Sequence, residues 1–301
     1  MIARFVMVFI VTGLITMYQN NYIHDTLRVM RAVIGNLLAL SSPHLYIKLT
    51  GQTGRGAQRE SAQQIAEYFR LCFDEYFKIL GVRTDKIEHY LAGKRVLEYG
   101  PGDTPGVGLL MLAHGAESVT CVDRFPMYTN LPRTVEVMEL IMSGLDGNSR
   151  WRAENAFVRR GDPGSGFVRE RLRYKIRPSG LSGLHGSVDL IISRSVLEHV
   201  NDLQATFVDM KSALRDDGIA IHKVDLRSHG LHRQNPLDFL TWSPSMWRLM
   251  HCNKGYVNRW RLNTYRDIAA EKGFNVLLIQ PTAIAERQDV EAIRPALAST
   301  M

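Results

Sequence analysis

Short apolar runs alternate with helical segments between residues 95 and 280, and this alternation is the feature that most constrains the fold. Parallel strands need long crossover connections, which are right-handed and place helices on both faces of the sheet. We therefore predict an α/β, doubly wound, mostly parallel sheet, preceded by an amphipathic helix over 57–80. The predicted strands are 95–100, 118–123, about 174–176, 187–195, 218–226 and 274–280, and the predicted helices are 105–115, 131–144, 201–218 and 262–273.

The stretch "VLEYGPGDTPGVGLL" at 96–110 ends the first predicted strand with a carboxylate and a glycine-rich turn. Ligands of such sheets bind beyond the carboxyl ends of the strands, where Gly100 and Gly102 let the backbone approach a ligand closely. A dinucleotide-binding turn needs a third glycine, and Pro105 occupies that position. Glu98, just before the glycines, would repel a pyrophosphate and favour a cationic ligand.

The second predicted strand also ends in an acidic residue, Asp123. A carboxylate at that place can accept hydrogen bonds from both hydroxyls of a ribose. A nucleoside with a cationic tail and no phosphate fits both carboxylates, and S-adenosylmethionine has this chemistry. We predict that it binds at Glu98, Gly100, Gly102 and Asp123, and at Ser193 near the end of the fourth strand.

The combination of "VLEYGPGDTPG", "VTCVD" and "VDLIISRSVLEHV" resembles the class I S-adenosylmethionine-dependent methyltransferases over residues 57–280. The resemblance implies a seven-stranded Rossmann-like sheet and an enzyme that uses S-adenosylmethionine. It places Glu98, Gly100 and Gly102 against the methionine part of the cofactor and Asp123 on the ribose. Thr104 departs from the pattern, because many members have a third glycine there.

The segment "IHKVDLRSHGLH" at 221–232 follows the fifth predicted strand and supplies the predicted catalytic residues. A hydroxyl acceptor needs a base to remove its proton, and we predict that base among Asp225, His229 and His222. The segment, with "NPLDFL" at 235–240 and "NRWR" at 258–261, is similar to bacterial methyltransferases linked to cell-surface sugar pathways.

"VLEHV" also resembles quinone-pathway O-methyltransferases, in which a glutamate three residues before the "EH" pair completes a set of residues linked to a metal. Ser195 occupies that position here, so Glu198 and His199 have no visible third partner. We predict no bound metal.

The expected acceptor is a hydroxyl of a sugar, a lipid-linked compound or another small metabolite. An RNA or protein methyltransferase is the alternative, because residues 150–177, within a predicted insertion at 147–180, hold nine basic and three acidic residues. Few aromatic side chains accompany this charge, which makes a nucleic-acid partner unlikely. A cofactor-binding scaffold without turnover is a second alternative.

Residues 2–17 are apolar almost throughout, with Arg4 inside the run, and they leave three interpretations open. They form a short membrane anchor, a buried or interfacial helix, or a signal peptide. We predict a helical extension over 1–56 before a methyltransferase domain over 57–301. Three widely spaced cysteines indicate a reducing compartment. The expected location is the cytoplasm, with membrane contact through residues 1–20.

Overall fold

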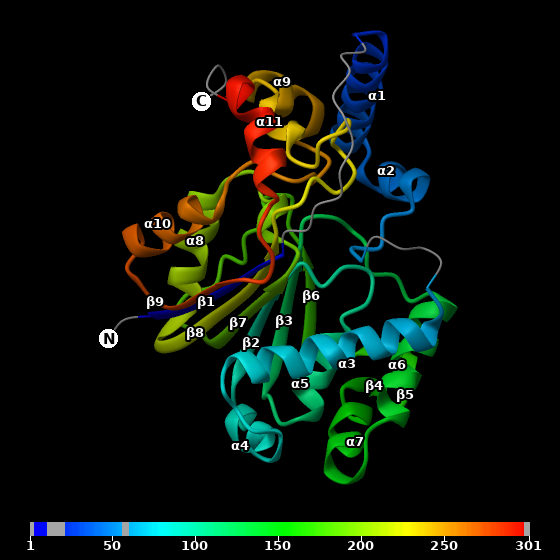
Figure 1. The fold of residues 1–301 in the computed structure, drawn as a ribbon. Coiled ribbons are helices and arrows are strands. Elements are labelled where there is room, and N and C mark those ends of the chain that lie inside the picture. The colour runs from blue at the N-terminus through cyan, green and yellow to red at the C-terminus, as the bar shows by residue number, and fades with distance from the viewer. Residues whose placement is uncertain (1–2, 11–21, 56–59, 298–301) are drawn as a thin grey trace.

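A seven-stranded sheet forms the centre of the protein (Figure 1). The computed structural model describes residues 3–10, 22–55 and 60–297. The strand order is β6-β3-β2-β7-β8-β1-β9, and all neighbouring strands are parallel. The predicted α/β class with a mostly parallel sheet is confirmed. The strands are β1 (Ala3–Ile10), β2 (Arg95–Tyr99), β3 (Ser118–Asp123), β6 (Leu172–Ile176), β7 (Val188–Arg194), β8 (Leu214–Asp225) and β9 (Phe274–Pro281).

The apolar N-terminal segment forms a strand inside this sheet, so the prediction of a helix is wrong for residues 3–10. β1 pairs with β8 on one side and β9 on the other, and Met7 is fully buried. A strand buried on both faces reads as a continuous apolar run, which a short membrane helix also does. The predicted boundary at residue 56 therefore does not separate this strand from the domain. Residues 11–21 lie outside the described residues.

Helices cover both faces of the sheet. One face packs against α3 (Ala62–Ile79), α4 (Ile87–Leu91), α5 (Gly106–Ala113), α6 (Pro132–Ser143) and α7 (Gly147–Glu154), with the short 3-10 turn η1 (Thr84–Lys86) before α4. The other face packs against α8 (Leu203–Ala213) and α10 (Leu262–Glu271). α3 begins with a reciprocal capping box between Ser61 and Gln64, which satisfies two backbone N–H groups.

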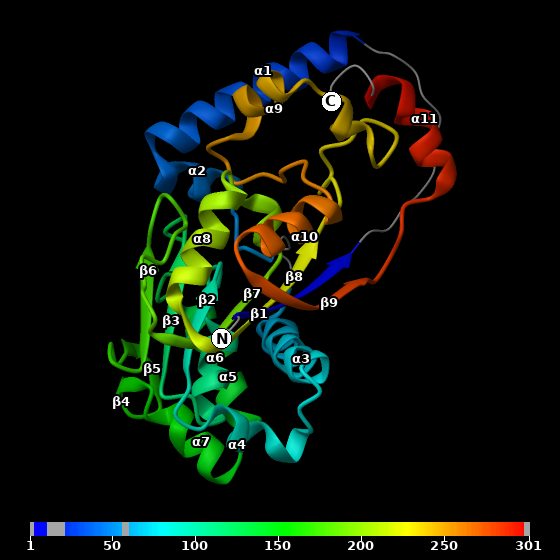
Figure 2. The same cartoon turned by 90° about the vertical axis from the view of Figure 1, so that its left-hand side faces the viewer.

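A layer of helices covers the carboxyl end of the sheet, and Figure 2 shows the arrowhead of β8 pointing toward it. We call this layer the cap. It joins the predicted N-terminal helices α1 (Tyr22–Ser41) and α2 (Pro43–Thr50) to segments from the other end of the chain. Those segments are η3 (Asp238–Thr241), α9 (Pro244–His251) and α11 (Arg287–Leu297). Among the described residues, no helix has the length and apolar character needed to span a bilayer.

The basic stretch at 150–177 belongs partly to the sheet. It runs from α7 through the antiparallel hairpin β4 (Phe157–Arg159) and β5 (Asp162–Phe167) to the edge strand β6. Four of its nine basic residues form ion pairs with acidic neighbours. The ion pairs are Arg150–Glu154 and Arg160–Glu154, Arg152–Glu88, and Arg159–Asp162.

Candidate functional site

The glycine turn after β2 has the backbone conformation that its sequence suggests. Gly100 and Gly102 have φ angles of +66° and +71°, in the left-handed region that favours glycine. A Cβ atom on Gly100 would lie 2.3 Å from Cγ2 of Val196, which follows β7. The turn is therefore packed directly against the loop between β7 and α8.

Residues 53–55, which follow α2, lie over this turn, and sequence patterns did not reveal this contact. The amide of Asp103 donates to the carbonyl of Thr53 at 3.1 Å, and Arg55 forms a bidentate ion pair with the Asp103 carboxylate. A Cβ on Gly102 would lie 2.7 Å from the Thr53 carbonyl oxygen. Only a glycine fits so close to the covering segment.

Asp123 holds the other side of the turn. Its carboxylate accepts hydrogen bonds from the amides of Gly102, at 3.3 Å, and Phe125, at 2.9 Å. Burial raises the pKa of Asp123 to about 6, although these backbone donors oppose the shift. The carboxylate therefore carries a desolvation cost that a bound hydrogen-bond donor would reduce.

Glu98 and two arginines line one pocket between the turn and α3. Burial raises the pKa of Glu98 to about 7. Arg55, which pairs with Asp103, and Arg194, which pairs with Glu75, line the same pocket, with Tyr68 and Tyr76 among its other walls. A pocket with a carboxyl group and two guanidinium groups suits a ligand that carries both an ammonium and a carboxylate.

A second group of polar side chains gathers where β7 and β8 end. The 3-10 turn η2 (Leu197–His199) follows β7, and His229 follows β8. The buried Glu198 accepts a hydrogen bond from the Asp225 amide at 3.1 Å. His229 Nε2 lies 3.2 Å from Asp225 Oδ2, and the rings of His199 and His229 are 5.1 Å apart. Sequence analysis predicted Asp225 and His229 separately, and the structure brings them into contact.

The charges within this group differ strongly. Burial, together with the Asp225 charge, raises the pKa of Glu198 well above its usual range. Burial disfavours the charge of Asp225, but hydrogen bonds from His229 and Arg227 outweigh that effect and hold its pKa well below its usual range. Burial and the neighbouring His229 lower the pKa of His199 to about 3. Asp225 is thus the anion of the group, and His199 is neutral.

Three of these residues could together hold a metal ion. One ligand atom from each of Glu198, His199 and His229 lies within 4.8 Å of the other two. Sequence analysis found only the first two, because His229 lies 30 residues further along the chain. The third potential ligand becomes visible only when β7 and β8 lie side by side.

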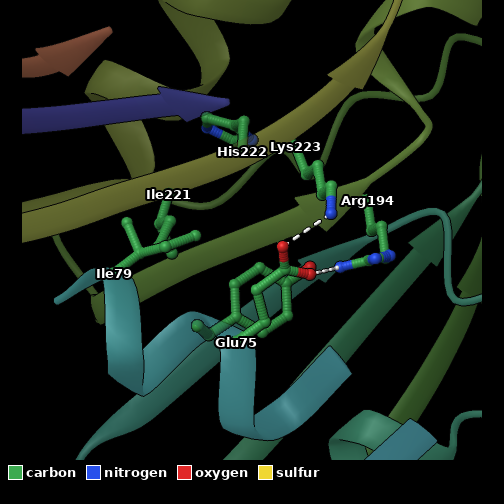
Figure 3. Close-up of a pocket in the computed structure, with 7 residues that line it drawn as sticks. Glu75, Ile79, Arg194, Ile221, His222 and Lys223 are labelled. Carbon is green, nitrogen blue, oxygen red and sulfur yellow. Dashed lines mark hydrogen bonds and ion pairs between the residues drawn. The ribbon is translucent and has the colours of Figure 1, made fainter. Parts of the chain in front are cut away.

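His222 and Ser193 lie apart from this group. Ser193 Oγ and His222 Nδ1 are 2.7 Å apart on adjacent strands, and His222 is fully buried. Burial lowers the pKa of His222 to about 3. In Figure 3, Glu75 lies between Lys223, at 2.6 Å, and Arg194, while His222 projects away from this ion-pair cluster. Of the predicted catalytic residues, Asp225 and His229 are thus in contact. The third, His222, is buried and connects β8 to β7 through Ser193.

The segments at 235–240 and 258–261 support the cap and the loop after β7. Asp238 accepts hydrogen bonds from the amides of Arg233 and Gln234. Asn258 donates to the carbonyl of Leu197 at 2.8 Å, next to Glu198. These residues hold the backbone around the second group.

Comparison with known proteins identifies a methyltransferase domain in this chain. A family model described as a methyltransferase domain matches residues 66–279. A solved S-adenosylmethionine-dependent methyltransferase from Mesorhizobium loti is 20% identical, with a TM-score of 0.40, over 69% of this chain and 86% of that one. Phosphoethanolamine N-methyltransferase 2 from Haemonchus contortus, solved with S-adenosyl-L-methionine, is 17% identical with a TM-score of 0.35. That match covers 60% of this chain and 33% of that one. No curated protein sequence matches the chain significantly.

Proposed function

Because the chain belongs to the class I S-adenosylmethionine-dependent methyltransferases, we propose that it methylates a hydroxyl of a sugar, a lipid-linked compound or another small metabolite. The contact between His229 and Asp225 at the carboxyl end of β8 carries this proposal. This contact places a base next to the loop that follows β7. Val196 of that loop packs against the glycine turn.

S-adenosylmethionine is the cofactor, and it supplies an electrophilic methyl group on its sulfonium. The close packing around Gly100 and Gly102 supports a ligand that contacts the backbone directly. In our proposal Asp123 accepts hydrogen bonds from the ribose, and Glu98 faces the cationic part of the cofactor. Arg55 and Arg194, on the wall of the same pocket, would hold the carboxylate.

In our proposal His229 is the base that removes the proton from the acceptor hydroxyl. Histidine is the most frequent general base in enzymes, and a carboxylate beside one ring nitrogen orients the other toward a substrate. Asp225 is suited to orient His229 rather than to act as the base, because a carboxylate with a strongly lowered pKa binds a proton weakly. His222 would link β7 to β8 through Ser193.

The acceptor class is argued from the exposure of His229 and from the charge of the basic stretch. His229 is exposed at the carboxyl end of the sheet, where a small or lipid-linked acceptor can reach it from solvent. The alternative of an RNA acceptor rests on the basic stretch alone, in which four of the nine basic residues pair with acidic neighbours. We place the enzyme in the cytoplasm, where S-adenosylmethionine is made.

The test is transfer of a labelled methyl group from S-adenosylmethionine into lipid and water-soluble fractions of a cell extract. His229→Ala should lower the rate about 10²–10⁴-fold, and calorimetry should find unchanged cofactor affinity. His232→Ala is the matched control, because His232 lies in the same loop and contacts Ser228.

Two results would contradict the proposal. Full activity of the His229 variant would remove its role as the base. We also expect full activity after treatment with a chelator. Loss of activity that added metal restores would instead make Glu198, His199 and His229 a metal site.

A further inference from the structure

The outward face of α1 is apolar along its length. Leu27, Met30, Ile34 and Leu37 follow the helical spacing that places side chains on one face, and each is at least 50% exposed. Leu45 and Leu49 continue the exposed apolar surface on α2. Soluble monomers rarely expose contiguous apolar patches of this kind unless the patch binds something.

Among the described residues of α1 and α2, the one acidic side chain is Asp25, which pairs with Arg233, and the other charged side chains are basic. Arg28, Arg31 and Lys48 are exposed on the same two helices. The sequence from residue 26 to residue 59 contains no aspartate or glutamate. The surface thus combines apolar with basic side chains, as helices that lie on anionic membranes do.

The body of the protein holds α1 firmly in this orientation. Asn36 donates to the Leu249 carbonyl at 2.8 Å and accepts from the Asn253 amide at 2.8 Å. Lys254 donates to the carbonyl of Ala32 at 2.9 Å. These bonds fix the inner face of α1 on the cap, so the apolar face is presented outward without a change in fold.

We propose that the outward face of α1 and α2 binds the surface of an anionic lipid bilayer. A second copy of the chain fits this surface less well. In a two-fold symmetric interface the same patch meets itself, so the basic residues Arg28, Arg31 and Lys48 of both copies would gather at one interface. Anionic lipid headgroups supply the missing negative charge.

This orientation sets the cap against the membrane, with the carboxyl end of the sheet directly behind it (Figure 2). It replaces the predicted contact through residues 1–20, since residues 3–10 lie in the sheet. The binding surface does not depend on the identity of the methyl acceptor. Its test therefore measures binding alone, and its outcome is independent of the proposed base.

The test is flotation of the full chain with phosphatidylcholine vesicles, with and without phosphatidylglycerol. We expect binding only to vesicles that contain phosphatidylglycerol, and weaker binding in high salt. Arg28→Glu combined with Arg31→Glu should weaken binding at least about 25-fold, since each basic residue contributes roughly fivefold. Ile34→Ser combined with Leu37→Ser should weaken it at least about tenfold.

Leu71→Ser is the matched control, because Leu71 is 59% exposed on α3 and Leu37 is 56% exposed on α1. Arg169→Glu is the control for charge reversal. Absence of flotation, or equal flotation of all variants, would overturn the proposal. A dimer that dissociates when Leu37 is changed, without vesicle binding, would show that the face binds a second copy.

Discussion

Replacing Asp123 with asparagine should stabilise the cofactor-free protein and weaken its binding of S-adenosylmethionine. Burial raises the pKa of this carboxyl from 3.8 to about 6. A shift of about two units costs the folded state about 3 kcal/mol when the group is ionised. Asparagine removes that cost but leaves one of the two backbone donors, Gly102 or Phe125, without its acceptor, a loss of about 1 kcal/mol. The expected net gain is about 2 kcal/mol at pH 8.

The pH dependence follows from the direction of the shift. At pH values well below 3.8 the carboxyl is protonated in both the folded and unfolded states, so ionisation costs nothing. Between pH 4 and pH 6 the folded state holds more protons, and its stability falls as pH rises. The advantage of Asp123→Asn should therefore grow over this window and remain constant above it.

Cofactor binding should change in the opposite direction. A carboxylate that accepts two ribose hydrogen bonds contributes more than a neutral amide, which offers a single oxygen. A loss of about 2 kcal/mol corresponds to an increase in Kd of about 30-fold. The wild-type protein should also bind less tightly below pH 6, where Asp123 takes up a proton.

Urea unfolding measures the stability, and titration calorimetry at pH 8 and pH 6 measures the affinity. Asp162→Asn is the control, because its carboxylate is exposed and pairs with Arg159. An unchanged Kd in the folded Asp123 variant would refute the ribose assignment. A destabilised variant would refute the desolvation cost that we assign to Asp123.

Three further substitutions test other parts of the site and fold. Gly100→Ala should reduce cofactor affinity at least about tenfold, because its Cβ would clash with Val196 and its φ angle is positive. Adding Val196→Ala should recover part of the lost affinity. No recovery would contradict the clash. Met7→Ala should cost about 2–5 kcal/mol in urea unfolding if β1 is buried in the sheet, whereas a loss well below this range would contradict its placement. Arg55→Gln should weaken cofactor binding roughly tenfold in calorimetry, and unchanged affinity would exclude contact with the cofactor carboxylate.

Much of the central sheet could be predicted from local patterns. The predicted strand at 118–123 coincides with β3, and the predicted helices at 105–115 and 131–144 match α5 and α6 within two residues. The glycine turn was also predictable, because an acidic strand end and closely spaced glycines suffice to identify it. These features depend on side-chain periodicity and backbone conformation within a few residues, which a sequence displays directly.

The partners of these elements were decided by tertiary structure. An apolar run at 3–10 has the same composition as a helix or a strand, and it became β1 because β8 and β9, more than 200 residues away, flank it. The contact between His229 and Asp225, the approach of Glu198, and the cover that Thr53 forms over Gly102 all join separate segments. Sequence alone determined which chemical groups this protein possesses. Long-range packing of the strand ends, which no local pattern encodes, decided which of those groups meet.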